Sequence, residues 1–169
     1  MQKIILTLFA FSELTKEIQR KVLNDLYFIN VEGDWHTPTF EGAQEAGITI
    51  KEFDIERQKI RITINTSCPQ VAEYITENWG HETQEYKLAK RFLSDAEALS
   101  EKEDNDEELT ALEDTFMSDL GELFLNALKD QYEYLMSDEA IAETFEANEY
   151  TFLESGKMFN ASQGEKIIN

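Results

Sequence analysis

Residues 100–108 read SEKEDNDEE, a run of carboxylates interrupted by one lysine and one asparagine. Closely spaced carboxylates can hold a divalent cation, imitate the phosphates of a nucleic acid, or bind a basic partner. Asp104-Asn-Asp106 resembles the start of a calcium loop, but the glycine at the sixth position and the spaced terminal glutamate are missing. We therefore expect no specific metal site and no cofactor. The run is interpreted as a binding surface.

A second group of residues could act in catalysis, but their spacing is unfavourable. Neither His36 nor His81 has a cysteine or a second histidine at the spacing of a zinc site. Cys68, the single cysteine, could act as a nucleophile only beside a histidine brought close by folding. Its place in the first turn of a predicted helix would lower the pKa of the thiol, although a small buried side chain is the commoner role. The sequence has no phosphate-binding glycine loop and no Gly-x-Ser-x-Gly motif.

The charge balance of the chain excludes several classes of partner. Its 169 residues include 35 acidic and 15 basic side chains, for a net charge of −20. Such a chain repels nucleic acid and anionic membranes and is attracted to basic surfaces. A basic patch with interleaved aromatic residues is also missing, so we expect no direct binding of nucleic acid.

The cysteine content and the apolar run near the N-terminus indicate the cellular compartment of the protein. A single cysteine cannot form a disulfide within the chain, which favours a reducing compartment. The apolar run near the N-terminus lacks a small-residue cleavage site and is shorter than the ~18 residues of a membrane span, so we interpret it as a strand. We expect a cytoplasmic protein that does not enter a membrane.

The surplus of acid is concentrated in one part of the chain. Residues 1–94 carry 14 acidic and 11 basic side chains, residues 95–149 carry 19 and two, and residues 150–169 carry two of each. The acids continue beyond the run along the polar face of the next predicted helix, where like charges three or four residues apart repel by about 0.2–0.5 kcal/mol per pair. We interpret a surface that tolerates this repulsion as functional, although a merely hydrated acidic face is the commoner case.

The elements that would position these residues are those of an α+β fold. Ile4–Phe11 is a strand-like run, long enough to be covered on both faces. An amphipathic helix of about four turns follows, beginning near Ser12 or Thr15, and a short helix then ends at Gly47. Residues 48–64 alternate as a β-hairpin with a one-residue slip, which predicts a β-bulge.

The second half of the sequence predicts a long helical hairpin. Ser67 is a good N-cap for one helix, and a helix from about Thr83 carries apolar residues at coiled-coil spacing. After the acidic run, an apolar stripe continues to Leu135, which corresponds to about 40 Å of helix. Ser137 begins a further short helix, and a terminal β-hairpin follows.

We therefore expect a small antiparallel sheet packed with helices, joined to an antiparallel helical hairpin with an acidic tip, within one compact domain overall. The expected segments are an α+β sheet module (1–80), the acidic hairpin (81–136), a short helix and β-hairpin that pack back on the sheet module (137–160), and a mobile tail (161–169).

Several stretches of the chain are similar to a known group of sequences. They include Ile29-Asn-Val-Glu-Gly-Asp-Trp35, Phe53-Asp-Ile-Glu-Arg57, Tyr132-Glu-Tyr-Leu-Met-Ser-Asp-Glu-Ala-Ile141 and Glu154-Ser-Gly-Lys157. In this order, the chain resembles an uncharacterised family of small acidic phage and prophage proteins, some labelled antitoxin-like. It departs from the family's pattern at His36, where a second tryptophan is usual. The resemblance implies a phage or mobile-element origin and, by analogy, an anti-CRISPR type of inhibitor; it carries over no catalytic residues.

Our leading hypothesis is a non-enzymatic inhibitor that binds a basic, nucleic-acid-handling host defence protein, such as a CRISPR effector nuclease. Its partner-binding residues are Glu101, Glu103, Asp104, Asp106, Glu107, Glu108, Glu113 and Asp114. The alternative is an antitoxin, or an interaction module that forms a homodimer through the apolar stripe of the hairpin. A hydrolase that uses Cys68 or His36 is the third hypothesis.

Overall fold

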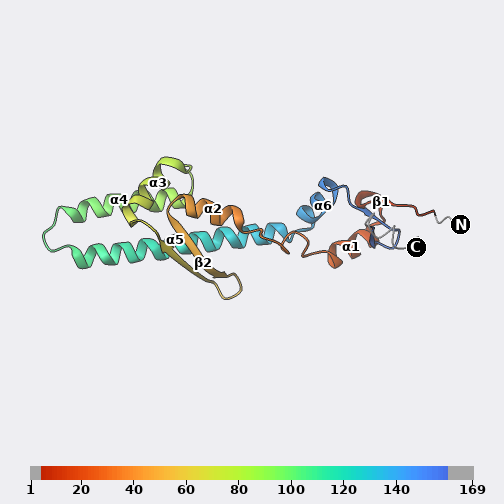
Figure 1. The fold of residues 1–169 in the computed structure, drawn as a ribbon, viewed down its shortest axis with the longest axis horizontal. Helices are drawn as coiled ribbons and strands as arrows, with labels where there is room; N and C mark the ends of the chain where they lie inside the picture. The colour runs from red at the N-terminus through yellow and green to blue at the C-terminus, as the bar shows by residue number, and fades with distance from the viewer. Residues whose placement is uncertain (1–4, 160–169) are drawn as a thin grey trace. The chain divides into compact units, whose positions relative to one another are not determined.

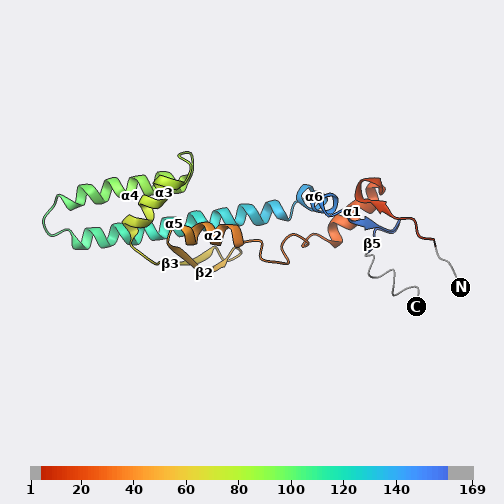
Figure 2. The same cartoon turned by 45° about the horizontal axis from the view of Figure 1, so that its top comes forward.

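The computed structural model describes residues 5–159 and has an α+β fold with small antiparallel sheets, as the sequence predicts (Figures 1 and 2). The chain divides into two compact units, which are described separately. Unit 1 consists of Met1–Trp35 and Tyr132–Asn169, and unit 2 consists of His36–Gln131.

Unit 1 is a three-stranded sheet with helices. Its elements are β1 (Phe9–Ala10), the 3-10 helix η1 (Phe11–Glu13), α1 (Lys16–Asp25), α6 (Asp138–Ala147), β4 (Thr151–Phe152) and β5 (Met158–Phe159). The strands are antiparallel in the order β1-β4-β5. The core of the unit brings α1, α6 and β4 together through Leu14, Val22, Leu23, Ile141, Phe145 and Phe152.

The predicted strand Ile4–Phe11 is wrong in its extent. Ile4 lies outside the described residues, and among residues 5–11 only Phe9 and Ala10 pair, opposite Phe152 and Thr151 of β4. The chain then turns into η1 instead of continuing as a strand. Large apolar residues that were expected to be covered on both faces are exposed, namely Ile5, Leu6 and Leu8.

The predicted C-terminal β-hairpin is confirmed, and it lies directly on α1. Gly156, in the turn between β4 and β5, adopts φ +84°. A Cβ at this position would lie 2.9 Å from side-chain atoms of Ile18 and Val22, so only glycine fits so close an approach without a shift. The expected tail, 161–169, lies outside the described residues.

Unit 2 contains the second sheet and the helical hairpin. Its elements are α2 (Thr37–Glu45), β2 (Ile48–Asp54), β3 (Lys59–Ile64), α3 (Cys68–Asn78), α4 (Gln84–Ser100) and most of α5 (Asp106–Leu135). β2 and β3 pair antiparallel, and the register shift between Ile50 and Glu52 confirms the predicted bulge. The strands of residues 5–159 thus form two separate sheets.

The core of unit 2 joins β2, α3 and the facing sides of α4 and α5. The rings of Phe92 and Phe116 stack between the two helices of the hairpin, with their centroids 4.4 Å apart. Burial of this apolar stripe leaves the acids at the start of α5, Asp106, Glu107 and Glu108, exposed. The other large buried side chains of this core include Ile48, Ile50, Val71, Ile75, Leu88, Leu120 and Phe124.

Local signals for helix starts and for the stop at Gly47 are confirmed, but α1 ends at Asp25 after 10 residues, short of the four turns predicted. Gly47 follows α2 with φ +82°. Four helices begin at a hydroxyl N-cap that accepts a hydrogen bond from the backbone of the first turn: Thr15, Ser67, Thr83 and Ser137.

The unit boundaries differ from the segments 1–80, 81–136 and 137–160 expected from the sequence. Residues 36–80 belong with the hairpin because β2 and α3 share a core with α4 and α5. Residues 5–35 belong with the described part of 137–160 because α1 shares a core with α6 and β4. Periodicity shows which face of an element is apolar, but not which element covers that face.

Candidate functional site

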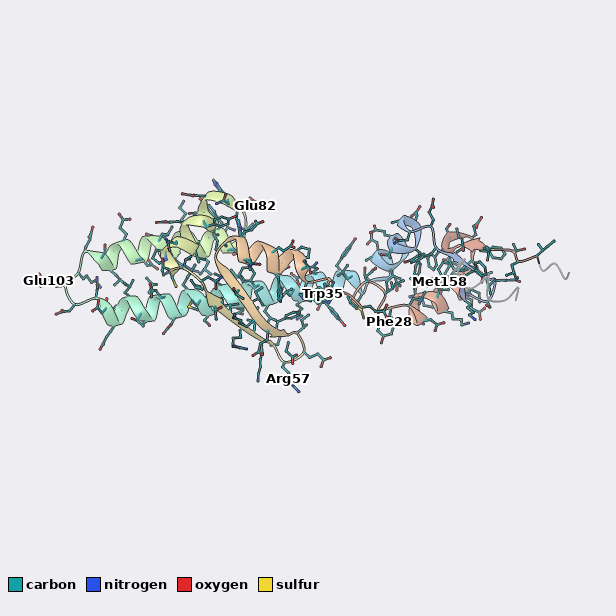
Figure 3. The ribbon with its side chains drawn as sticks, in the orientation of Figure 1. Phe28, Trp35, Arg57, Glu82, Glu103 and Met158 are labelled. Atoms are coloured by element: carbon teal, nitrogen blue, oxygen red, sulfur yellow. The ribbon has the colours of Figure 1, made fainter. Side chains whose placement is uncertain are left out.

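The candidate site is the acidic tip of the helical hairpin in unit 2. α4 ends at Ser100 and α5 begins at Asp106, so residues 101–105 form the connecting turn. Within unit 2, the hairpin extends beyond α3 and the β2–β3 sheet in both ribbon views (Figures 1 and 2). Figure 3 labels Glu103 in the turn itself, where its side chain points away from the two helices.

Asn105 connects the two helices at the tip. Its side-chain amide donates a hydrogen bond of 2.8 Å to the carbonyl oxygen of Leu99, near the end of α4. Its own carbonyl oxygen accepts a bond of 2.9 Å from the N–H of Leu109 in α5. Asp104, which precedes it, has φ +58°, a left-handed conformation that aspartate tolerates better than most residues. One short polar residue thus satisfies the end of one helix while its backbone begins the next.

All eight residues that the sequence predicts for partner binding lie on the hairpin, and the structure divides them into two groups. The first group lies in or directly after the turn and is exposed: Glu101, Glu103, Asp104, Asp106, Glu107 and Glu108. Lys102 is the one base among them, and its Nζ lies 3.2 Å from Glu108 Oε2. Because both partners of this pair are largely exposed, it contributes little stability, and the tip stays strongly anionic.

The second group, Glu113 and Asp114, lies about 10 Å further along α5. These carboxylates are close enough to Cys68, in the first turn of α3, to affect its ionisation. Burial, and then the charges of the two acids, raise the pKa of the Cys68 thiol to about 11. The expected lowering of this pKa is therefore wrong.

Two further acids of the tip, Asp95 and Glu97, were missed in the sequence analysis. Both are exposed on the last turns of α4. Residues 95–114 carry ten acidic and one basic side chain, whereas residues 84–94 carry one and three. The hairpin is thus polarised along its length toward the tip. The predicted antiparallel helical hairpin could have identified Asp95 and Glu97, because it places the end of α4 beside the start of α5.

The two histidines have aromatic packing contacts. The ring centroid of His36 lies 4.6 Å from that of Phe40 and 5.6 Å from that of Phe53. His81 stacks on Tyr86 with a centroid separation of 4.4 Å and an interplanar angle of 24°. These contacts fit the structural role that a lone histidine usually has.

Trp35 and Cys68, the remaining residues considered for a functional role, also have structural surroundings. Trp35 lies against Tyr132, with ring centroids 5.5 Å apart. Cys68 is buried, and its raised pKa keeps the thiol protonated near neutral pH, whereas a nucleophile requires the thiolate. The geometry therefore gives no support to the hydrolase hypothesis.

A groove of about 470 Å³ lies between β3 and α5 in unit 2. Its charged lining residues are Arg61 and Glu122. Arg61 Nε donates a hydrogen bond of 2.9 Å to Glu52, and this bond and the positive charge lower the pKa of that carboxyl. Since the guanidinium is already engaged by Glu52, we assign no reaction to the groove.

The described residues contain neither a cluster of metal-binding side chains nor a membrane-spanning helix. In residues 5–159, no three side chains of the types that bind metals lie close enough to hold an ion, including those around Asp104 and Asp106. None of the helices in the same part of the chain combines the length and the apolar content needed to span a bilayer.

Comparison with known proteins found no relatives. No family model matches the chain, and no curated protein and no solved structure is significantly similar to it. The resemblance to small acidic phage proteins therefore stays a prediction from the quoted motifs. Function is therefore inferred from the fold and the charges of the chain itself.

Proposed function

We propose that this chain is a non-enzymatic inhibitor of phage or mobile-element origin, whose acidic hairpin binds a basic, nucleic-acid-handling defence protein of a bacterial host. The observation that carries the proposal is the polarised hairpin, which gathers exposed carboxylates at the end of two packed helices (Figure 3). The motif resemblance supports the phage origin and makes a CRISPR effector nuclease the first partner to test.

A row of carboxylates on a helix can enter a cleft that holds phosphates. One helical turn advances ~5.4 Å, and B-DNA has one phosphate per ~3.4 Å of axis on each strand. Acids on both sides of the turn, from Asp95 to Asp114, present negative charge at a comparable density. The hairpin would therefore compete with nucleic acid for the same lysine and arginine side chains of its partner.

The packing of the hairpin makes it suited to this role. The stacked pair Phe92 and Phe116 holds α4 against α5, and Asn105 connects their ends at the tip. Fewer degrees of freedom are lost on binding when a charged surface is already ordered. Attraction between opposite charges also speeds encounter, and it weakens as ionic strength rises.

The alternative of a homodimer through the hairpin has less support. It needs the apolar stripe of α5 to be accessible to a second copy. In unit 2 the central residues of this stripe are buried within the unit, namely Phe116, Leu120 and Phe124. An antitoxin that binds a basic toxin through the tip would use the same surface as the proposed inhibitor, so the identity of the partner separates the two.

The proposal predicts that reversing the charge of the tip abolishes binding. The variant carries Glu101→Lys, Glu103→Lys, Asp106→Lys and Glu107→Lys, which changes the net charge from −20 to −12. A pull-down from host lysate at low and high salt first selects candidate partners. Binding to these, and to purified, guide-loaded CRISPR effector nucleases, is then measured by biolayer interferometry. We expect affinity to fall by at least about 100-fold, because close charge pairs at interfaces contribute several kcal/mol.

A matched control separates the position of the charges from their number. Glu41→Lys, Glu56→Lys, Glu73→Lys and Glu77→Lys make the same change in net charge at exposed sites of unit 2 outside the tip. Circular dichroism checks that both variants fold. Equal affinity for the tip variant and the wild type, or equal losses in both variants, would contradict the proposal.

A further inference from the structure

Unit 1 has an exposed apolar segment that its own fold does not cover. In the described residues, large apolar side chains that are exposed occur only in unit 1: Ile5, Leu6, Leu8, Tyr27 and Tyr134. Three of these five fall within four consecutive residues, just before β1. Ile5 is the most exposed, at 84%. An apolar cluster of this kind on an otherwise polar surface is typical of an interaction site.

This N-terminal segment, residues 5–8, has strand composition but no partner strand among the described residues. Only the next two residues pair, with β4, and β1 lies at the edge of the sheet order β1-β4-β5. The backbone N–H of Ala10 is already occupied, because it donates a hydrogen bond of 2.7 Å to Glu13 Oε2. Backbone groups available for pairing with another strand are therefore those of residues 5–8, before Ala10. Exposed strand edges are templates for pairing with another chain.

A groove of about 440 Å³ lies beside this edge in the same unit. Its apolar lining comes from η1, α6 and the start of β4, and includes Phe11, Ala142, Phe145 and Tyr150. Its charged lining residues are Glu146 and Glu149. Ala10 also lines it. Pairing with another strand would extend β1 through residues 5–8, and the two-residue period of a strand would then place Leu6 and Leu8 on the face of Ala10, next to the groove.

We propose that the N-terminal segment pairs with the same segment of a second copy of this chain, and that each copy places its apolar side chains in the groove of the other. The segment and the groove are complementary. The groove has an apolar lining, and residues 4–12 carry no charge, so the segment can approach Glu146 and Glu149 of a second copy without like-charge repulsion.

Self-association through this region also avoids the main obstacle to dimerisation. Two chains of net charge −20 repel each other at most surfaces, but an uncharged run brings few like charges together. Because segment and groove belong to one chain, the exchange is reciprocal and closes as a two-fold symmetric dimer. The dimer does not use the hairpin, so it is independent of the function proposed above.

Sedimentation velocity on the full chain tests the proposal at concentrations from about 1 to 100 μM. We expect the mass to rise from 19.6 kDa toward twice that value, and to do so at high salt as well as low. The double variant Leu6→Asp, Leu8→Asp is expected to stay monomeric. Asn24→Asp with Ser155→Asp, which adds the same charge at exposed positions of unit 1 outside the groove, should still dimerise.

Hydrogen exchange provides a second measurement on the same samples. Amides of residues 5–8 should be protected in the dimer and exchange fast in the double variant, with circular dichroism showing that its fold is kept. A wild-type chain that remains monomeric overturns the proposal, whether the segment then binds its own groove or a different protein. A dimer that survives the double substitution also overturns it, because its interface must lie elsewhere.

Discussion

Cys68 illustrates how surroundings reverse a local electrostatic signal. Its position in the first turn of α3 would favour the thiolate, because a helix N-terminus carries partial positive charge. Burial and the neighbouring charges of Glu113 and Asp114 act in the opposite direction and outweigh it. The two acids come from α5, about 45 residues later in the sequence, so their effect on Cys68 exists only in the folded chain.

The raised pKa of Cys68 predicts a loss of stability at alkaline pH. The folded-state pKa of about 11 lies above the ordinary value of 9.0, so the unfolded chain releases this proton first as the pH rises. Stability that is fully present below pH 9 is therefore lost as the pH rises toward 11, with about 1 kcal/mol lost by pH 10. Urea unfolding followed by circular dichroism at about pH 8 and pH 10 measures the effect.

The Cys68→Ala variant is the control for this pH dependence. Lysine and tyrosine side chains titrate in the same range in both proteins, so their contributions cancel in the difference between the two curves. The stability of the wild type should fall relative to that of Cys68→Ala as the pH rises. A difference that stays constant with pH would show that the thiol is not perturbed.

The hairpin turn is the element on which the proposed function depends. The chain reverses direction within five residues, one of them in a left-handed conformation. The last four backbone carbonyls of α4 have no hydrogen-bond donor within the helix and need partners outside it. Asn105 supplies one through its side chain. The acidic tip is thus ordered by a polar residue that carries no charge itself.

Replacing Asn105 by alanine should loosen the tip without changing its charge. We expect the free energy of unfolding to fall by about 1 kcal/mol, the usual contribution of one such hydrogen bond. Amides of residues 99–109 should exchange faster in hydrogen-exchange mass spectrometry. Asn126→Ala, at an exposed position of α5, is the control. Unchanged exchange at the tip of the Asn105→Ala variant would show that the turn is held by other contacts.

For the whole molecule, the dominant electrostatic property is self-repulsion. The net charge is −20, and the ion pairs seen among the described residues lie between side chains that are each more than a third exposed. Exposed pairs of this kind contribute about 0–1 kcal/mol each, so they offset little of the repulsion. Compactness is maintained instead by the two apolar cores.

This balance predicts that salt stabilises the protein. Raising NaCl from about 20 to 300 mM shortens the Debye length and screens the repulsion, and we expect the thermal midpoint to rise by a few °C. Potassium chloride at the same ionic strength should act equally if screening is the cause. The tip variant of net charge −12 should respond less to salt than the wild type. A midpoint that falls with added salt would mean that attractive charge pairs prevail.

Features that depend on neighbours in the sequence were predictable. Ser67 accepts a hydrogen bond from a residue three positions later, and Gly47 ends a helix through its own backbone conformation. The bulge between Ile50 and Glu52 appears in the sequence as a slip of alternation. The six exposed acids from Glu101 to Glu108 were predictable for the same reason, because a turn between two helices places its polar residues outside.

The sequence by itself determined the types of the elements, their caps and the concentration of acid around one turn. Only the tertiary structure decided which elements share a core, that Glu113 and Asp114 lie near Cys68, and that the apolar residues before β1 are exposed. The physical reason is range. Backbone preferences and capping bonds act within a few residues, whereas burial depends on which distant segment covers an apolar face, and many segments have the same apolar pattern.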